Sequence, residues 1–354
     1  MTLKEAFKYG VGKLQEAGII EARQDSFYIL EHVTRISREK YYADQHQEMS
    51  KEEQEDVIAF IHKRCERIPL QHIMGTTEFM GLPFKVNSQV LIPRQETELL
   101  VETALEVIKG YDKKHLAEDE SLKEAGVYGN KEVGYHRDDE REELLILDMC
   151  TGSGCVLIST LCHGSKYFPK MRGVGVDISK EALDVARENA LLNGVSVTED
   201  SASMNDSSVA KENGISNSLG AVKITLVESD LFQQLEKVKK EDTKVKKIGY
   251  NKKYDIVLSN PPYIPSKEIE SLQEEVKHHD PILALDGGVD GLHFYRQITK
   301  DCRKYLNRDG TLIVECGWNQ GEEVSQIMKD HGFANVKMIK DLNGLDRVVV
   351  GNYG

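Results

Sequence analysis

The stretch Glu143-Leu-Leu-Ile-Leu-Asp-Met-Cys-Thr-Gly-Ser-Gly154 predicts the core of the fold, because it joins a buried strand to a helix through a tight turn. The apolar run ends at Asp148, the turn carries two glycines, and an apolar helix pattern starts at Val156. Glycines at such a turn let a ligand approach the backbone above a helix N-terminus. The stretch therefore indicates a ligand-binding unit of an α/β sheet.

This turn differs from the turns that bind nucleotide phosphates. A dinucleotide fingerprint needs Gly or Ala three places after Gly154, where Leu157 stands, and a P-loop needs a Lys-Ser/Thr pair that is absent here. The carboxylate at the end of the strand fits a positively charged ligand better than a pyrophosphate. The sequence therefore favours a cationic ligand at this turn.

Acids also end the next two predicted strands. The second strand ends at Asp177, and Ser179 caps the helix that follows it. An acid at this position holds a ribose through its hydroxyls in α/β folds, although a buried structural or capping Asp is the alternative. The third strand ends at Asp230, and this acid with apolar Leu231 could meet the amino group and ring of an adenine.

A fourth strand ends at a different kind of motif, Tyr254-Asp-Ile-Val-Leu-Ser-Asn-Pro-Pro-Tyr263. The two prolines fix φ and lack N–H donors, and Pro261 pushes Asn260 into an extended conformation. The result is a rigid set of hydrogen-bond acceptors that suits a planar –NH2 group, with Tyr263 covering its plane. The alternative is a strand that ends in a Pro-Pro loop with a packed tyrosine.

Strand and helix patterns alternate to the end of the chain. We expect helices over 294–306 and 321–331, with strands over 310–317, 336–341 and 346–351. Between them, 276–291 is predicted as a glycine-rich loop whose adjacent His278 and His279 point apart and make a poor metal pair. The alternation predicts an α/β fold with a doubly wound, mostly parallel, seven-stranded sheet.

The flanking segments predict the domain organisation. Helical periodicity over 1–68 indicates a small all-α domain, and glycines and a proline over 69–92 indicate a hairpin linker. A helix is expected from Leu99 to Ile108, and Arg94, Glu96 and Glu98 before it either line a site or favour the helix dipole. The sheet domain spans 93–354, with insertions predicted near 110–143, 196–222 and 236–253.

Composition excludes several function classes. The net charge of −13 gives no overall basic footprint for gripping nucleic acid. Six cysteines show no C-x-x-C pair and no zinc-like spacing, so we expect free thiols and no metal. No secretory segment and no apolar run of membrane-spanning length is present, so a soluble, cytoplasmic protein is expected.

Taken together, these motifs resemble a known family. Asp148 with Gly152-Ser-Gly154, then Asp177, Asp230 and Asn260-Pro-Pro-Tyr263, in this order at strand ends, resemble the S-adenosylmethionine-dependent methyltransferases of Rossmann-like fold. The Asn-Pro-Pro-Tyr form is shared by enzymes that methylate planar amino groups. Three further stretches and the small helical N-terminal domain are similar to the release-factor glutamine methyltransferases (the HemK/PrmC family): Gln71-His-Ile-Met-Gly-Thr-Thr-Glu-Phe79, Leu91-Ile-Pro-Arg-Gln-Glu-Thr-Glu98 and Gly317-Trp-Asn-Gln-Gly321.

The resemblance implies roles for particular residues. Asn260, Pro261 and Tyr263 would be catalytic, and together with Pro262 they would bind the glutamine amide of the Gly-Gly-Gln loop of release factors. Cys150 occupies the first glycine position of the family's Asp-x-Gly-x-Gly-x-Gly turn, so cofactor affinity is the property that this departure affects. S-adenosylmethionine would be bound by Asp148, Cys150, Thr151, Gly152, Ser153, Gly154, Asp177, Asp230, Leu231 and Asn260.

Two other readings remain open at this point. The same Asn-Pro-Pro-Tyr chemistry could act on ribosomal-protein glutamine or on nucleic-acid adenine. The acidic composition and the lack of an aromatic and basic base-reading module argue against stable nucleic-acid binding, and no membrane partner is expected. The chain could instead be a non-catalytic, cofactor-binding partner of a translation factor.

Overall fold

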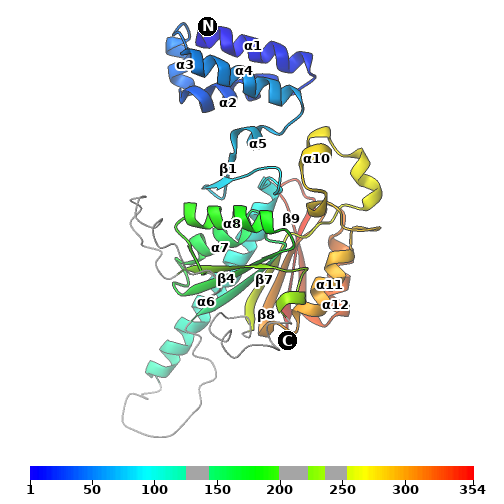
Figure 1. Cartoon of the computed structure of the whole chain (residues 1–354). Helices are drawn as coiled ribbons and strands as arrows, with labels where there is room; N and C mark the ends of the chain where they lie inside the picture. The colour runs from blue at the N-terminus through cyan, green and yellow to red at the C-terminus, as the bar shows by residue number, and fades with distance from the viewer. Residues whose placement is uncertain (125–142, 199–221, 236–252) are drawn as a thin grey trace. The chain divides into compact units, whose positions relative to one another are not determined.

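The computed structural model describes residues 1–124, 143–198, 222–235 and 253–354, and Figure 1 shows the chain. Most of the predicted insertions near 110–143, 196–222 and 236–253 therefore lie outside the described residues. The chain divides into two compact units. The helical unit comprises Met1–Thr77, Lys85–Ile92 and Glu268–Ile282, and the sheet unit comprises Glu78–Phe84, Pro93–Lys267 and Leu283–Gly354.

Helices α1 and α4 of the helical unit begin at residues that cap them. The hydroxyls of Thr2 and Ser50 each accept a hydrogen bond from the backbone N–H of a Glu three positions on, and the carboxylate of that Glu accepts one from the backbone N–H of the cap, which forms a capping box. A cluster of buried apolar side chains holds the helices together. The helices are α1 (Leu3–Glu16), α2 (Ala22–Thr34), α3 (Arg38–Asp44), α4 (Lys51–Cys65), α5 (Leu70–Met74) and α10 (Glu274–His279).

Helix α10 corrects one expectation, since a loop was predicted from Val276 onward. His278 and His279 form the last turn of this helix. Acidic residues in its first turn and basic residues in its last turn complement the helix dipole, which explains a helix in a segment with few apolar residues.

The sheet unit is built of alternating strands and helices, with the hairpin strands β1 and β2 separately paired. Its strands include β3 (Leu144–Met149), β4 (Met171–Asp177), β5 (Ser196–Val197), β6 (Lys223–Glu228), β7 (Tyr254–Ser259), β8 (Leu306–Glu315), β9 (Phe333–Lys340) and β10 (Asp346–Tyr353). Its helices are α6 (Glu98–Glu124), α7 (Cys155–Gly164), α8 (Lys180–Leu192), α11 (His293–Cys302) and α12 (Gly321–Asp330). The remaining elements are β1 (Thr76–Phe79), β2 (Leu82–Lys85) and the 3-10 turns η1 (Gln95–Thr97), η4 (Ser266–Ser271) and η5 (Ile282–Ala284).

The sheet confirms the predicted fold class. Its strand order is β5-β6-β4-β3-β7-β8-β10-β9, parallel except where β10 runs antiparallel to β8 and β9. The two-residue strand β5 extends the predicted seven strands at one edge. Successive strands β4 and β6 lie on one side of β3, whereas β7 and β8 lie on the other. The order of the strands thus reverses at β3, and ligands of open α/β sheets bind beside such a point, at the carboxyl ends of the strands.

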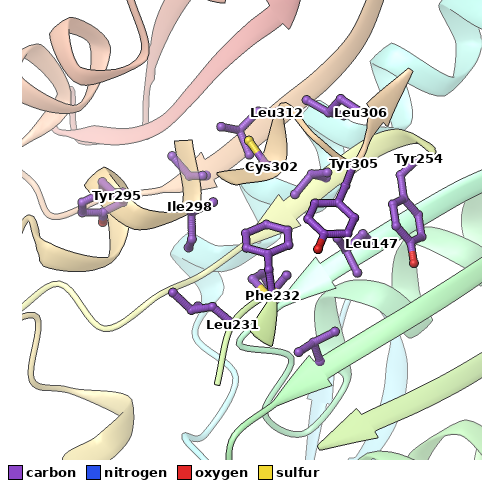
Figure 2. Packing of buried hydrophobic residues seen from close by; sticks show 14 of the residues in the cluster. Leu147, Leu231, Phe232, Tyr254, Tyr295, Ile298, Cys302, Tyr305, Leu306 and Leu312 are labelled. Carbon is purple, nitrogen blue, oxygen red and sulfur yellow. The ribbon is translucent and has the colours of Figure 1, made fainter. Parts of the chain in front are cut away.

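Helices cover both faces of the sheet, because alternate side chains of each buried strand point to opposite faces. On one face, Leu145 and Leu147 join an apolar cluster with α11 and α12, and on the other Leu144 and Ile146 join a cluster with α6 and α7 (Figure 1). In the first cluster the ring of Phe232 stacks on Tyr305 with centroids 4.8 Å apart (Figure 2). Tyr305 directly precedes β8, so this stack ties the loop after β6 to the amino end of β8.

Helix α6 is longer than expected. It ends at Glu124, so the predicted end at Ile108 is wrong, and residues 110–124 of the predicted insertion or linker are helical. The segment 110–124 contains three Lys, three Glu and two Leu and no proline. These residues have high helix propensity, so a stretch poor in large apolar side chains continues the helix.

Several features are missing from the part of the chain that the structure describes. No helix in it is both long and apolar enough to span a membrane. No cluster of three or more His, Cys, Asp or Glu side chains among the described residues could hold a metal ion. All six cysteines are free thiols.

Candidate active site

The sheet brings the motif-bearing strand ends together. Strand β3 lies between β4 and β7 and pairs in parallel with both. The Ser259 hydroxyl donates to the Met149 carbonyl at 2.7 Å, which ties the ends of β7 and β3. Since Asp148, Asp177 and Asn260 lie at or just after these ends, they share one edge of the sheet. Burial raises the pKa of the Cys150 thiol, and the charges of Asp177, Asp148 and Asp230 add to this shift, so all three predicted acids lie within electrostatic reach of Cys150.

The turn after β3 is open above Gly152. Cys150, Gly152 and Gly154 all adopt positive φ, at 62°, 54° and 77°. A Cβ at Gly154 would lie 2.9 Å from the Ile158 side chain, so this glycine allows the helix to pack closely. A Cβ at Gly152 would meet nothing within 4 Å. The open side of the turn therefore has room for a ligand.

Asp148 stabilises the turn through a hydrogen bond with Thr151. Its carboxylate is 1% exposed and accepts a hydrogen bond from the Thr151 hydroxyl at 2.6 Å. Burial raises the pKa of Asp148 to about 7, against the lowering effect of the Thr151 hydrogen bond. The neighbouring Ser153 is buried too, and its carbonyl accepts from the Asn189 side chain at 2.9 Å. These contacts make the turn rigid.

Asp177 is linked directly to the same turn. Its carboxylate accepts hydrogen bonds from the backbone N–H groups of Gly152 and Ser179, both at 2.9 Å. Burial raises its pKa, although the backbone hydrogen bonds oppose this shift. Ile178, the next residue, is 53% exposed, and sequence reasoning missed it as a candidate apolar contact for a ligand. An apolar residue directly after an acid at a strand end was the available signal.

The third acid has a different environment. Asp230 is exposed and accepts from the Gln233 side chain at 2.6 Å. Leu231 is buried with φ of 47°, and the Ser229 hydroxyl donates to its carbonyl at 2.7 Å. The Ser229 N–H also donates to the Asp177 carbonyl at 2.8 Å, which joins this loop to β4. The loop is therefore fixed next to the ribose-binding candidate Asp177.

The Asn-Pro-Pro-Tyr segment presents two acceptors that have no partner in the described residues. Pro261 and Pro262 are buried, whereas Asn260 and Tyr263 are partly exposed. The Asn260 Nδ2 donates to Thr97 Oγ1 at 3.3 Å. Neither the Asn260 Oδ1 nor the Pro261 carbonyl accepts a hydrogen bond from any described residue. A planar –NH2 group has two N–H bonds that could satisfy such a pair.

Tyr263 is held from its backbone side by the Gly317-Trp-Asn-Gln-Gly321 stretch. The Gln320 side chain donates to the Tyr263 carbonyl and accepts from the Gly317 N–H, both at 2.9 Å. A Cβ at Gly287 would lie 2.7 Å from the Tyr263 Cα, so the glycine-rich loop also packs closely on this residue. Burial raises the pKa of Tyr263 to about 12, so its phenol is neutral at physiological pH. Sequence reasoning found the stretch only by resemblance and missed the role of Gln320.

Some residues around the start of α6 contact the candidate site, whereas others only stabilise the fold. Glu98 accepts from the Met80 N–H at 2.7 Å and thus ties down the turn of the β1–β2 hairpin. Glu96 is exposed. The charge of Arg94 acts on Tyr263 and on the buried Glu315. Thr97, which lies between Glu96 and Glu98 in the sequence, contacts Asn260. Sequence reasoning missed this contact because only the charged residues of this stretch were considered.

Cys150 offers a direct test of backbone strain in the turn. A side chain in the left-handed region costs about 1–2 kcal/mol, and glycine loses about 0.5–1 kcal/mol through greater freedom of the unfolded chain. We therefore expect Cys150→Gly to raise the free energy of unfolding by about 0.5–1 kcal/mol, measured by urea denaturation. Cys150→Ala keeps the Cβ and should give no such gain. An equal gain in both variants would assign the effect to the thiol instead of the backbone.

The reversed strand order, the antiparallel final pair and the glycine turn beside acidic strand ends define the class I methyltransferase fold. Comparisons with known proteins narrow this class. A release factor glutamine methyltransferase from Geobacter sulfurreducens is 31% identical over 353 residues, which cover 100% of this chain and 97% of that protein. Another from Bacillus cereus is 31% identical over 99% of this chain and 98% of that protein. The chain therefore belongs to the release factor glutamine methyltransferase family.

Family models and solved structures add detail. The model described as PrmC N-terminal domain matches residues 5–75, and the model described as Eco57I restriction-modification methylase matches residues 173–285. A solved protein-(glutamine-N5) methyltransferase (release factor-specific) from Alicyclobacillus acidocaldarius is 20% identical, with a TM-score of 0.34 over 76% of this chain and 98% of that chain.

Proposed function

We propose that the protein transfers a methyl group from S-adenosylmethionine to the side-chain amide nitrogen of the glutamine in the Gly-Gly-Gln loop of peptide-chain release factors. The observation that carries this proposal is the pair of acceptors at Asn260 and Pro261 at the edge of the sheet where Asp148 and Asp177 lie. Family membership supports the choice of a protein glutamine as the acceptor. The release factors are proposed as its partners, and the cytoplasm as its compartment.

The residues of the acidic turn fit S-adenosylmethionine. When bound, this cofactor supplies an electrophilic methyl group on a positively charged sulfonium. Burial raises the pKa values of Asp148 and Asp177, so a nearby cation would stabilise the ionised form of both carboxyls. The room above Gly152 suits close approach of the ligand to the backbone, and Asp177 would bind the ribose hydroxyls. Thr151, Ser153 and Gly154 would shape the turn, while Asp230 and Leu231 would border the adenine.

The Asn-Pro-Pro-Tyr segment would orient the acceptor nitrogen. An amide nitrogen is a poor nucleophile because its lone pair is delocalised into the carbonyl. Asn260 Oδ1 and the Pro261 carbonyl would accept its two N–H bonds, while Tyr263 packs on the amide plane next to Pro262. Positioning of this kind is worth about 7–11 kcal/mol in favourable cases. The same two acceptors would stabilise positive charge that develops on the nitrogen. The methyl would pass from sulfur to nitrogen with S-adenosylhomocysteine as the neutral leaving group, and the surplus N–H proton would then pass to water.

Methyl transfer to a release factor tests the proposal. Purified protein is incubated with radiolabelled S-adenosylmethionine and a release factor, and in parallel with a copy in which the Gly-Gly-Gln glutamine is replaced by alanine. We expect label on the intact factor alone. Label on both copies would place the target elsewhere in that protein, and label on neither, with cofactor binding measured, would reject release factors as substrate.

A second candidate, adenine methylation, is favoured by one observation. The Eco57I match covers the segment from β4 through the Asn-Pro-Pro-Tyr stretch, which is suited to any planar amino group. The net charge of −13 disfavours a nucleic-acid substrate. Including DNA and RNA as acceptors in the same assay separates the two functions, since label on nucleic acid would support adenine methylation.

A further inference from the structure

A chain of polar side chains leads from Asn260 into the interior of the sheet unit. The Asn260 Nδ2 donates to Thr97 Oγ1 at 3.3 Å, and the Thr97 hydroxyl lies close enough to Glu315 to lower the pKa of its carboxyl. Thr97 is 2% exposed and ends the turn η1, and Glu315 is 1% exposed and ends β8. Three segments distant in sequence thus meet behind the proposed amide site. Neither Thr97 nor Glu315 carries a role in the function proposed above.

The chemistry of this chain favours one direction of donation when Glu315 is ionised. A carboxylate accepts hydrogen bonds and donates none, so an ionised Glu315 favours the orientation in which the single proton of the Thr97 hydroxyl points to it. The Thr97 oxygen then has only lone pairs left for Asn260, and only the NH2 end of the Asn260 amide can donate to them. The oxygen end of that amide must therefore face away from Thr97, where it stays free to accept.

The surroundings of Glu315 support an ionised carboxylate above neutral pH. Burial raises the pKa of Glu315 to about 7, and the Thr97 hydroxyl and the positive charges of Arg347 and Arg94 lower it. The buried Oε2 atom of Glu315 has no hydrogen-bond partner in the described residues, which leaves it an acceptor toward which the Thr97 hydroxyl can turn. The carboxylate is costly to bury and depends on this hydroxyl.

We propose that Thr97 and Glu315 are positioning residues that hold the Asn260 side chain with its oxygen toward the methyl-accepting –NH2 group. The proposal deepens the proposed function and rests on it for the identity of the substrate. Without the Thr97 hydroxyl the Asn260 amide can rotate by 180°. Its NH2 end would then face the –NH2 group of the substrate, donor against donor, and the nitrogen would lose one of its two acceptors.

A pair of substitutions at Thr97 separates the hydroxyl from the shape of the side chain. Thr97→Val is nearly isosteric and removes the hydroxyl, whereas Thr97→Ser keeps it. At pH 8, we expect Thr97→Val to lower kcat for release-factor methylation by about 10- to 100-fold, since misplacement of a reacting group costs up to about 100-fold. Cofactor affinity should stay at the wild-type value, and Thr97→Ser should restore most of kcat.

Thr160→Val serves as the matched control. Thr160 lies on α7, is fully buried, and its hydroxyl has no hydrogen-bond partner in the described residues. The same chemical change there should leave kcat at the wild-type value. Thr97→Val with wild-type kcat, or a loss of kcat in Thr97→Ser as large as in Thr97→Val, would overturn the positioning role.

A thermodynamic cycle tests the contact without any substrate. Urea unfolding midpoints are measured for Thr97→Val, Asn260→Ala and the double variant, and we expect the double variant to shift by less than the sum of the single shifts. Additive shifts would show that the two side chains do not interact and would reject the inference. If the midpoints are non-additive but wild-type protein labels no release factor, the proposed function fails while the Asn260–Thr97 contact stands.

Discussion

Asn260→Ala is expected to lower kcat for methylation of a release factor by about 100- to 1000-fold. This is the cost of removing one preorganised hydrogen-bonding group that stabilises developing charge. The Asn260 oxygen is one of two acceptors at the site without a partner in the described residues, so its loss leaves the amide nitrogen held at one point only. Cofactor binding should be less affected, because the turn at Gly152 and the acid Asp177 remain. Single-turnover kinetics and calorimetric titration with S-adenosylmethionine measure the two quantities separately.

Asn343→Ala is the control for this substitution. Asn343 is exposed in the turn between β9 and β10, and only its backbone N–H forms a hydrogen bond, to Asp341. Its replacement should change neither kcat nor thermal stability. A large loss of folding in Asn260→Ala would instead favour the simple alternative of a structural Asn at a strand end. Equal losses of cofactor affinity and kcat would assign Asn260 to cofactor binding alone.

The fold was predictable because two sequence patterns mark each central strand: an apolar run and a polar residue at its end. Each central strand is an apolar run, as a parallel sheet covered on both faces requires, and each ends abruptly at a polar residue. Parallel strands place their carboxyl ends at one edge, so the order Asp148, Asp177, Asn260 predicted that these residues meet. The register of β3 with β4 and β7 places them as expected.

What the sequence could not provide are the contacts between segments that no local pattern connects. Thr97 is an uncharged residue between two glutamates, and nothing in its neighbourhood shows that it contacts Asn260. Gln320 reaches the Tyr263 carbonyl only because β8 pairs with β7, a pairing that depends on sheet order. The end of α6 was misjudged for another reason: the apolar content of residues 110–124 was weighed above their helix propensity.

Asp25→Ala is expected to lower the free energy of unfolding by about 3 kcal/mol. The substitution breaks a buried ion pair and removes a negative charge that balances the buried guanidinium of Arg64. The Arg64 Nε donates to the Asp25 carboxylate at 2.7 Å, and the two side chains are 11% and 7% exposed. Arg64 also contacts Glu275 at 3.3 Å, and Arg67 contacts the same carboxylate. Thermal or urea unfolding followed by circular dichroism measures the change.

The loss of unfolding free energy in Asp25→Ala depends on the burial of the ion pair. A surface ion pair in the same unit provides the control. Lys13 and Glu16 pair at 2.8 Å on α1, with side chains 45% and 70% exposed, so Glu16→Ala should lower the free energy of unfolding far less than Asp25→Ala does. Similar losses in the two variants would contradict the argument from burial. Glu275 adds a second consequence, since it lies in the Glu268–Ile282 segment of the helical unit, soon after Tyr263 in the sequence. We therefore expect Asp25→Ala also to loosen the contacts of Glu275 with Arg64 and Arg67, which anchor this segment within the helical unit.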